Sequence, residues 1–363
     1  MKLRRARWVP LACAILALSA ATASASSYRT KAFRVTKGIG EPWGMAMDRT
    51  GNIWFAEPGC DFAPLCDPGD PPGQIGEMTP STHKIVLHTL PRIPGNQPIF
   101  VVFDNRGKLW FTTPGNGRIG EYDPAKRRFV GQWPVTAGSA PWDLTSAGGR
   151  IWYTEYLGAA IGSFNPATHS HRDFPTPSPD SQPYGIAARR GLIWFTENNS
   201  SVARVAVLDT GAHDLIREYP IGVPLSGNGT PHMITIGPSG HPWWSEGFSG
   251  TIATLDPTIA TPGSCEGVIT TCTGIRRFRL PPPSGCTLGS HTSGISFDRA
   301  RHLVWLDDSL TGQVGSFNPS RGAFRLTKLA GCNDHPHDGL ILGKSGNVWF
   351  DEEFANRLGE LIP

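Results

Sequence analysis

The chain has 363 residues, of which 39% are hydrophobic and only 17% are charged, so it can bury one large core or two ordinary ones. Glycine (43 residues) and proline (33 residues) are abundant. This composition indicates many turns and few charged helices, and it favours an all-β fold. The formal net charge is +3, and the excess of positive charge comes from the N-terminal segment. Whether the protein has a basic face for nucleic acid or lipid therefore depends on whether that segment is retained.

Residues 1–25 are predicted to be a secretory signal peptide. "MKLRRAR" is a basic start, "WVPLACAILALSAATA" is apolar, and "ASA" precedes Ser26 as a cleavage site requires. The apolar stretch is short for a membrane span, so we expect a secreted, extracellular protein without one. Cleavage removes four of the 33 basic residues and none of the 30 acids, which leaves 29 − 30 = −1. Such a mature protein offers no basic face to nucleic acid or anionic lipid.

The rest of the chain contains seven copies of one unit. The third copy reads "APWDLTSAGGRIWYTE" before "AAIGSFNP", and the fourth begins "QPYGIAARRGLIWFTE". Each copy has a marker tryptophan, and neighbouring markers lie 42 to 62 residues apart. A repeat of this length is typical of β-propeller blades. The markers are Trp54, Trp110, Trp152, Trp194, Trp243, Trp305 and Trp349.

Each unit contains four strand-like runs in a fixed order. A P-x-G-I strand leads through a Gly turn into a W-F-x-E strand, then into an I-G strand, and finally into a short run such as "REYP". The runs alternate in polarity and are bounded by Gly, Pro, Asn or Asp. The sequence therefore predicts an all-β, seven-bladed β-propeller with four-stranded blades. The seventh copy has only three strands, and we expect "KAFRVTK" (31–37) to complete it and close one domain over residues 26–363.

Six cysteines remain after the signal peptide, an even number that predicts disulfides in an exported protein. Six cysteines allow 15 pairings, so the sequence does not fix them. Cys60 and Cys66 are close enough to clip one loop, and Cys265 and Cys272 another. "GCTLGSH" and "GCNDHPH" place Cys286 and Cys332 at the same point of adjacent units, five residues before a histidine. A bond between those two would staple neighbouring loops.

The residue after the proline of each first strand is expected to line one mouth of the central channel. In chain order these positions hold Trp43, Ile99, Trp142, Tyr184, His232 and then, displaced by a residue or two, His291 and His337. The mouth would be aromatic on one side and histidine-rich on the other, which suits a large, partly apolar ligand with a polar reacting group. The alternative is that Trp43 and Trp142 only fill gaps between blades.

Glu353 is the one acid after a marker tryptophan that the repeat does not explain. Glu352 occupies the ordinary W-F-x-E position, whereas Glu353 follows it only in the seventh unit. It is either a solvated charge on the rim or, with His291, His335 and His337, part of a metal cluster, because histidine and carboxylate are common metal ligands. The repeated tryptophans themselves are expected to pack between sheets.

The unit "P-x-G-I … G-x-I-W-F-T-E … N-x-I-G" resembles that of the virginiamycin B lyases, also called streptogramin B lyases, over essentially the whole mature chain. The resemblance implies a magnesium-dependent enzyme that opens a cyclic depsipeptide at its ester by elimination. A base removes the proton α to a carbonyl and the ester oxygen leaves as carboxylate. Histidine suits the base, and a hard cation suits the developing enolate.

The family's functional residues map onto the last blades of this chain. The resemblance assigns the general base to His337 and the cation to Glu353, with His291 or His232 polarising or orienting the substrate. Two positions depart from the pattern. An acidic metal ligand of the family is replaced by His335, and a first-blade tyrosine by Trp43, which can stack on a ligand but has no phenol. Trp43, Trp142 and Tyr184 are the candidate substrate contacts.

Three functions remain open from the sequence. The first is a secreted, monomeric carbon–oxygen lyase that acts with a divalent cation and serves in antibiotic resistance. The second is a non-catalytic propeller that binds an extracellular peptide, glycan or cell-wall component at the same mouth. The third, a secreted hydrolase or lactonase, has less support, because no G-x-S-x-G, P-loop or HExxH motif is present.

Overall fold

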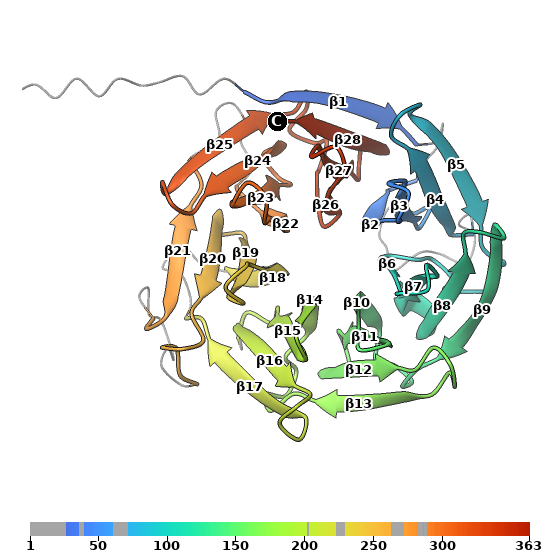
Figure 1. Cartoon of the computed structure of the whole chain (residues 1–363), viewed down its shortest axis with the longest axis horizontal. Helices are drawn as coiled ribbons and strands as arrows, with labels where there is room; N and C mark the ends of the chain where they lie inside the picture. The colour runs from blue at the N-terminus through green and yellow to red at the C-terminus, as the bar shows by residue number, and fades with distance from the viewer. Residues whose placement is uncertain are drawn as a thin grey trace, which may run out of the picture.

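The computed structural model describes residues 27–35, 40–60, 72–201, 203–222, 229–262, 272–281, 286 and 289–363. Seven four-stranded antiparallel sheets stand in a ring (Figure 1), so the predicted seven-bladed β-propeller is confirmed. One short 3-10 helix, η1 (Pro114–Asn116), follows β7. Within the described ranges, no helix is long and apolar enough to cross a membrane.

Each blade uses four strands that are consecutive in the chain, except the last. Blades 1 to 3 contain β2 (Trp43–Met47), β3 (Ile53–Glu57), β4 (Gln74–Thr79) and β5 (Lys84–Thr89); β6 (Val101–Phe103), β7 (Leu109–Thr113), β8 (Arg118–Asp123) and β9 (Arg128–Pro134); and β10 (Pro141–Ala147), β11 (Arg150–Glu155), β12 (Ala160–Phe164) and β13 (His171–Pro175). Blades 4 and 5 contain β14 (Pro183–Arg189), β15 (Leu192–Glu197), β16 (Arg204–Asp209) and β17 (Leu215–Pro220); and β18 (Thr230–Ile236), β19 (Pro242–Gly247), β20 (Thr251–Leu255) and β21 (Ile275–Arg279). Blades 6 and 7 contain β22 (Thr292–Asp298), β23 (Leu303–Asp308), β24 (Gln313–Asn318) and β25 (Ala323–Lys328); and β26 (Leu340–Leu342), β27 (Val348–Glu352), β28 (Arg357–Ile362) and β1 (Arg29–Arg34).

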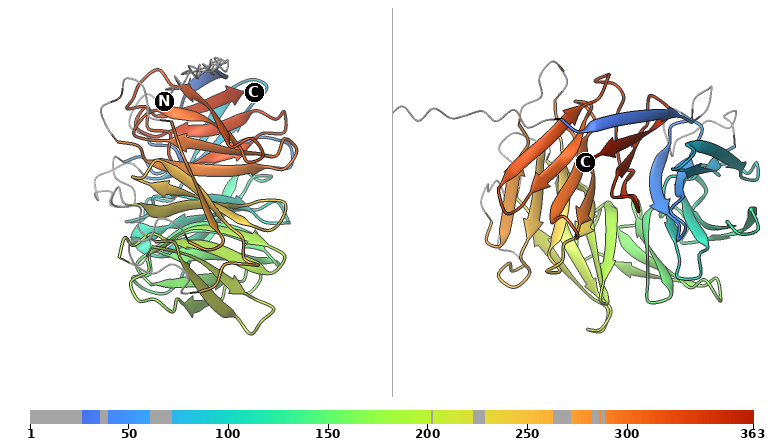
Figure 2. Two further views of the ribbon diagram at one scale, coloured as in Figure 1. Left: turned by 90° about the vertical axis from the view of Figure 1, so that its left-hand side faces the viewer. Right: turned by 45° about the horizontal axis from the view of Figure 1, so that its top comes forward.

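The ring closes through its N-terminal strand, as the sequence predicts. β1 pairs antiparallel with β28 from Arg29 opposite Ile362 to Arg34 opposite Arg357, and so supplies the outer strand of blade 7. β1 lies along the outside of that blade (Figure 2). Because β1 pairs with β28, the outer edge of β28 is not left open.

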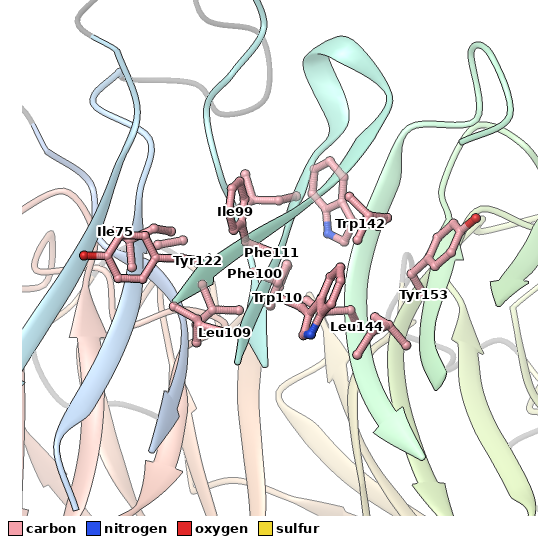
Figure 3. Packing of buried hydrophobic residues seen from close by; sticks show 14 of the residues in the cluster. Ile75, Ile99, Phe100, Leu109, Trp110, Phe111, Tyr122, Trp142, Leu144 and Tyr153 are labelled. Carbon is pink, nitrogen blue, oxygen red and sulfur yellow. The ribbon is translucent and has the colours of Figure 1, made fainter. Parts of the chain in front are cut away.

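The marker tryptophans pack between neighbouring sheets, as expected. Trp54 of blade 1 lies 5.8 Å from the ring of Tyr122 in blade 2, and Trp110 of blade 2 lies 5.6 Å from Phe164 in blade 3. Both indoles are almost fully buried, and Figure 3 shows Trp110 among the apolar side chains of this core. Each indole N–H donates to an aspartate of its own blade's first turn, Asp48 for Trp54 and Asp104 for Trp110. In these two blades the repeat therefore buries a large aromatic group without leaving its N–H unpaired.

The I-G element of the repeat has a packing reason. Gly76 and Gly120 lie on the third strands of blades 1 and 2, opposite Phe55 and Phe111 of the second strands. A Cβ atom at either glycine would come within about 2 Å of the phenylalanine ring. The aromatic ring of the W-F pair therefore lies directly on the glycine backbone, which a larger residue would prevent.

Candidate functional site at the centre of the ring

The innermost strands carry a β-bulge at the residues predicted to line the mouth. In blade 4, Pro183 pairs with Glu197 and Ile186 with Phe195, so two residues, Tyr184 and Gly185, oppose one. Blades 3, 5 and 6 have the same irregularity between their first and fourth residues of the motif. A bulge turns a side chain away from the regular alternation. The P-x-G-I motif is thus the sequence of a bulge that presents its x residue at the centre of the ring.

In blades 3 to 5 a hydroxyl opposite the bulge fixes the backbone of the presented residue. Thr196 of blade 4 accepts a hydrogen bond from the Gly185 amide at 2.9 Å and donates to the carbonyl of His232 in blade 5 at 2.6 Å. The equivalent residues of blades 2, 3 and 5 donate to the next blade in the same way. These bonds are Thr112 to Trp142, Thr154 to Tyr184 and Ser245 to Ser293. The T of W-F-T-E is therefore a positioning element for the neighbouring blade's central residue, a role the sequence analysis missed.

The predicted aromatic side of the site is present as one continuous cluster. The ring of Trp142 lies 6.0 Å from Trp43 and 5.4 Å from Tyr184, and Tyr184 stacks on His232 at 4.2 Å. Trp43 in turn lies 5.6 Å from His337. All these side chains except His337 are less than 9% exposed. They do more than fill gaps between blades, because they contact one another across the centre.

The three candidate catalytic histidines converge. His232, His291 and His337 each offer a nitrogen, and the three nitrogens lie within 4.8 Å of one another. The rings of His291 and His337 are 5.7 Å apart, and those of His232 and His291 are 4.9 Å apart. The displacements of His291 and His337 in the repeat therefore do not remove them from the site.

Glu353 and His335 lie beside this group and contact each other. His335 Nδ1 is 2.8 Å from Glu353 Oε2, and His337 Nδ1 is 3.5 Å from the same oxygen. Glu353 is only 5% exposed, which rules out the alternative of a solvated rim charge. His335 is further covered by Phe354, whose ring stacks on it at 4.0 Å.

Asp338 is a central residue that the sequence analysis did not name. The seventh copy reads P-H-D-G where the first and fourth read P-W-G and P-Y-G, so Asp338 and not His337 directly precedes the glycine. Its side chain is fully buried and contacts His232 at 3.2 Å. The inserted residue was the signal available in the sequence.

Hydrogen-bond partners indicate which imidazole nitrogens carry protons. His291 Nδ1 is 2.9 Å from Ser309 Oγ, and that hydroxyl donates to the His291 carbonyl at 3.2 Å. Nδ1 of His291 must then be the donor, which leaves its Nε2 with a free lone pair. An ionised Glu353 can only accept a hydrogen bond, so His335 then donates to it from Nδ1. His337 Nδ1 faces Glu353 and Asp338 but has no hydrogen-bond partner among the described residues.

Burial lowers the pKa of these imidazoles and so keeps them neutral, whereas the pKa values of the two neighbouring acids shift in opposite directions. It lowers the pKa of His335 to about 4 and places the pKa of His291 well below its usual value, while His337 is lowered less because Asp338 and Glu353 oppose the effect. Burial raises the pKa of Glu353 to about 7. Asp338 differs: although burial opposes its ionisation, His337, His232 and the hydrogen bonds it accepts hold its pKa well below the usual range. The site therefore contains neutral bases beside one firmly ionised carboxylate.

The predicted staple next to the site is present. Cys286 and Cys332 form a disulfide that joins the loops before the first strands of blades 6 and 7. Cys60 and Cys272 are also disulfide-bonded. Their predicted partners, Cys66 and Cys265, lie outside the described residues.

Solved structures of known lyases share this architecture. A streptogramin B lyase structure matches with a TM-score of 0.74 at 21% identity, covering 92% of this chain and 97% of that one. Selenomethionine-substituted virginiamycin B lyase from Staphylococcus aureus matches with a TM-score of 0.72 at 20% identity, covering 93% and 100%. A catalytically inactive form of the Staphylococcus aureus enzyme with quinupristin matches with a TM-score of 0.72 at 19% identity, again covering 93% and 100%.

At these identities the structural likeness shows the fold alone, and no curated protein matches the chain. The family assignment comes instead from the sequence of residues 93–363, which matches the virginiamycin B lyase family. That stretch includes His232, His291, His337 and Glu353 and covers more than half of the chain. The chain belongs to the virginiamycin B lyase family.

Proposed function

We propose that this protein is a carbon–oxygen lyase that opens the ester of a cyclic depsipeptide-type substrate by elimination. The observation that carries the proposal is the convergence of His337, Glu353 and His291 at the centre of the ring. In the reaction, His337 takes the proton α to a carbonyl. The electron pair forms a Cα–Cβ double bond, the Cβ–O ester bond breaks, and the carboxylate leaves without consumption of water.

His337 is suited to this role by its neighbours. Burial lowers its pKa, so the imidazole is neutral and can accept a proton at neutral pH. Glu353 Oε2 lies 3.5 Å from Nδ1 and Asp338 Oδ2 lies 3.8 Å from it. The negative charge of Asp338, joined by that of Glu353 when it is ionised, stabilises the imidazolium that forms when His337 takes the proton, as a carboxylate does in a catalytic triad.

The residues also fit a divalent cation. A cation held by Glu353 and His335 together would replace the hydrogen bond between His335 Nδ1 and Glu353 Oε2, because Nε2 of the same ring points away from Glu353. Bound there, a cation would polarise a substrate carbonyl and stabilise enolate charge. Magnesium takes oxygen ligands, whereas manganese or zinc also accepts imidazole. The replacement of an acid by His335 therefore favours an ion that tolerates nitrogen over the magnesium implied by the family.

The decisive experiment offers quinupristin, the compound present with the inactive Staphylococcus aureus enzyme, to purified protein with magnesium, manganese or zinc. Elimination gives a ring-opened product with the mass of the substrate, a new elution time and no ¹⁸O from labelled water. Hydrolysis would add one water and incorporate the label. No conversion by this protein, in assays where a known lyase turns over, would reject this substrate and reaction.

A second candidate function is ligand binding without catalysis. It is favoured by the rim, where Leu157, Phe248 and Phe354 are 67%, 58% and 55% exposed and lie on the loops after the second strands of blades 3, 5 and 7. Exposed apolar groups around a polar centre suit a peptide, glycan or wall component. Binding of such a ligand that survives His337→Ala unchanged, with no turnover by either protein, would establish this function instead.

A further inference from the structure

The carboxylate of Asp338 connects blade 7 to four other blades. Its Oδ1 accepts a hydrogen bond from Ser293 of blade 6 at 2.6 Å and lies 3.2 Å from His232 Nε2 of blade 5. Its Oδ2 accepts from the Tyr184 hydroxyl of blade 4 at 2.6 Å and from the Trp43 indole of blade 1 at 3.1 Å. A carboxylate accepts about four hydrogen bonds, so the three donors, together with His232 Nε2 facing Oδ1 at 3.2 Å, occupy it fully. Asp338 therefore has no lone pair left for a cation or a substrate group.

The other nitrogen of His232 is fixed as well. Asn198 Nδ2 lies 3.1 Å from His232 Nδ1 and donates to the Pro231 carbonyl at 2.9 Å. That second bond identifies the amide nitrogen, rather than its oxygen, as the group that faces the ring. His232 Nδ1 must then accept, and its proton lies on Nε2, directed at Asp338. Both nitrogens of His232 thus face a polar partner, Asn198 at 3.1 Å and Asp338 at 3.2 Å.

We propose that Asp338 is a positioning residue that, together with Asn198, locks His232 as the Nε2–H tautomer. His232 can then neither accept the substrate proton nor bind a cation. The neighbouring His337 differs, because its Nδ1 lies 3.8 Å from Asp338, beyond hydrogen-bond distance, whereas His232 Nε2 lies 3.2 Å from that carboxylate. Proton transfer is left to His337, while His232 holds Tyr184 by ring stacking at 4.2 Å.

The tautomer can be tested without any substrate. Protein labelled with ¹⁵N-histidine is studied by NMR near pH 7, and the His232 signals are assigned by their loss in His232→Gln. We expect a protonated Nε2 and an unprotonated, hydrogen-bonded Nδ1. In Asp338→Asn, one carboxylate oxygen becomes an NH₂ group that faces two donors, so at least one of these contacts must break and the signals of His232 should shift toward a mixture of tautomers.

Asp143→Asn is the matched control. Asp143 is a buried aspartate at the bulge of blade 3, but among the described residues its oxygens accept only the backbone amides of Leu144 and Ile186. Its substitution should leave the His232 signals unchanged. A second variant acts from the other side of the ring: Asn198→Asp replaces the donor with an acceptor and should add a proton at Nδ1. This variant keeps the test available if Asp338→Asn does not fold.

The consequence for turnover rests on the proposed lyase function. Outer partners of catalytic groups contribute about 10- to 100-fold, so Asp338→Asn should lower kcat by about that factor with little change in KM. A wild-type His232 protonated on Nδ1, or on both nitrogens, would overturn the inference whatever the reaction. Unchanged His232 signals in a folded Asp338→Asn protein would also overturn it. If the tautomer is as inferred but no depsipeptide is opened, the proposed function fails and the positioning role stands.

Discussion

Glu57, the acid that ends the second strand of blade 1, should cost the protein stability at neutral pH. The side chain is 1% exposed, and both carboxylate oxygens lack a hydrogen-bond partner among the described residues. Burial raises the pKa of Glu57 from 4.5 to about 8. The folded protein therefore keeps this carboxyl protonated at pH 7, whereas the unfolded chain ionises it.

The sign and size follow from proton linkage. Because the folded pKa of Glu57 is the higher one, its contribution is fully favourable below pH 4.5 and is lost as the pH rises to about 8. Each pKa unit corresponds to about 1.4 kcal/mol. At pH 7 the unfolded group is about 2.5 units above its pKa, which gives a loss of about 3 kcal/mol relative to pH 4. Glu57→Gln cannot ionise and should remove this dependence.

The assay is urea unfolding of wild type and Glu57→Gln at pH 4, 5.5 and 7, followed by tryptophan fluorescence. The free energy of unfolding of the variant relative to wild type should rise by about 3 kcal/mol from pH 4 to pH 7. Glu246, at the same position of blade 5, is the control, because Arg277 Nε pairs with it at 2.9 Å. Glu246→Gln leaves a largely buried arginine unpaired and should destabilise by about 3 kcal/mol at pH 7. A Glu57→Gln difference that is flat or falls with pH would refute the reasoning.

Four further outcomes are expected. Replacing both Cys286 and Cys332 with serine opens a link with a sequence separation of 46 residues, and unfolding should become easier by about 4 kcal/mol on the chain-entropy estimate; an unchanged urea midpoint would contradict this. His337→Ala should lower the rate of ring opening by about 10²–10⁴-fold with an unchanged circular-dichroism spectrum, and activity near wild type would remove it as the base. Chelation with EDTA should abolish turnover, and Glu353→Gln should weaken cation binding measured by calorimetry; equal binding by both proteins would place the cation elsewhere. Expressed with residues 1–25 in a host that secretes proteins, the chain should appear in the medium with Ser26 as its first residue, and a retained N-terminus would contradict the signal peptide.

The repeat made the fold predictable because each unit contains the motifs that determine the local structure of its own blade. The bulge of the first strand recurs from blade to blade, and several blades repeat the glycine under an aromatic ring and the Asp that accepts the indole N–H. Ring closure was predictable for the same reason: "KAFRVTK" looks like the outer strand of blade 6, and β1 takes the equivalent place in blade 7. Cys286 and Cys332 were paired because they occupy one position in adjacent units.

The candidate site was only partly predictable, because its contacts cross the ring. The first-strand positions identified Trp43, Trp142, Tyr184 and His232, but periodicity does not say which central side chains touch. Asn198 lies just beyond the W-F-T-E strand of blade 4 and could not be singled out, since its partner His232 belongs to the next blade. Glu353 showed the opposite case, where one extra acid beyond the repeat was enough to identify it.

Asp338 shows where a repeat protein can place a new function. In blades 3 to 6 the carbonyl of the residue presented at the bulge accepts a hydrogen bond from a hydroxyl of the preceding blade. Blade 7 has one more residue at this point and a short first strand, and Asp351 takes the position that holds a hydroxyl in blades 2 to 5. The Asp351 carboxylate accepts the amides of His337 and Gly339, so it fixes the backbone on both sides of Asp338. Asp338 then reaches four other blades, and places where one unit breaks the common pattern are where strain and function are expected.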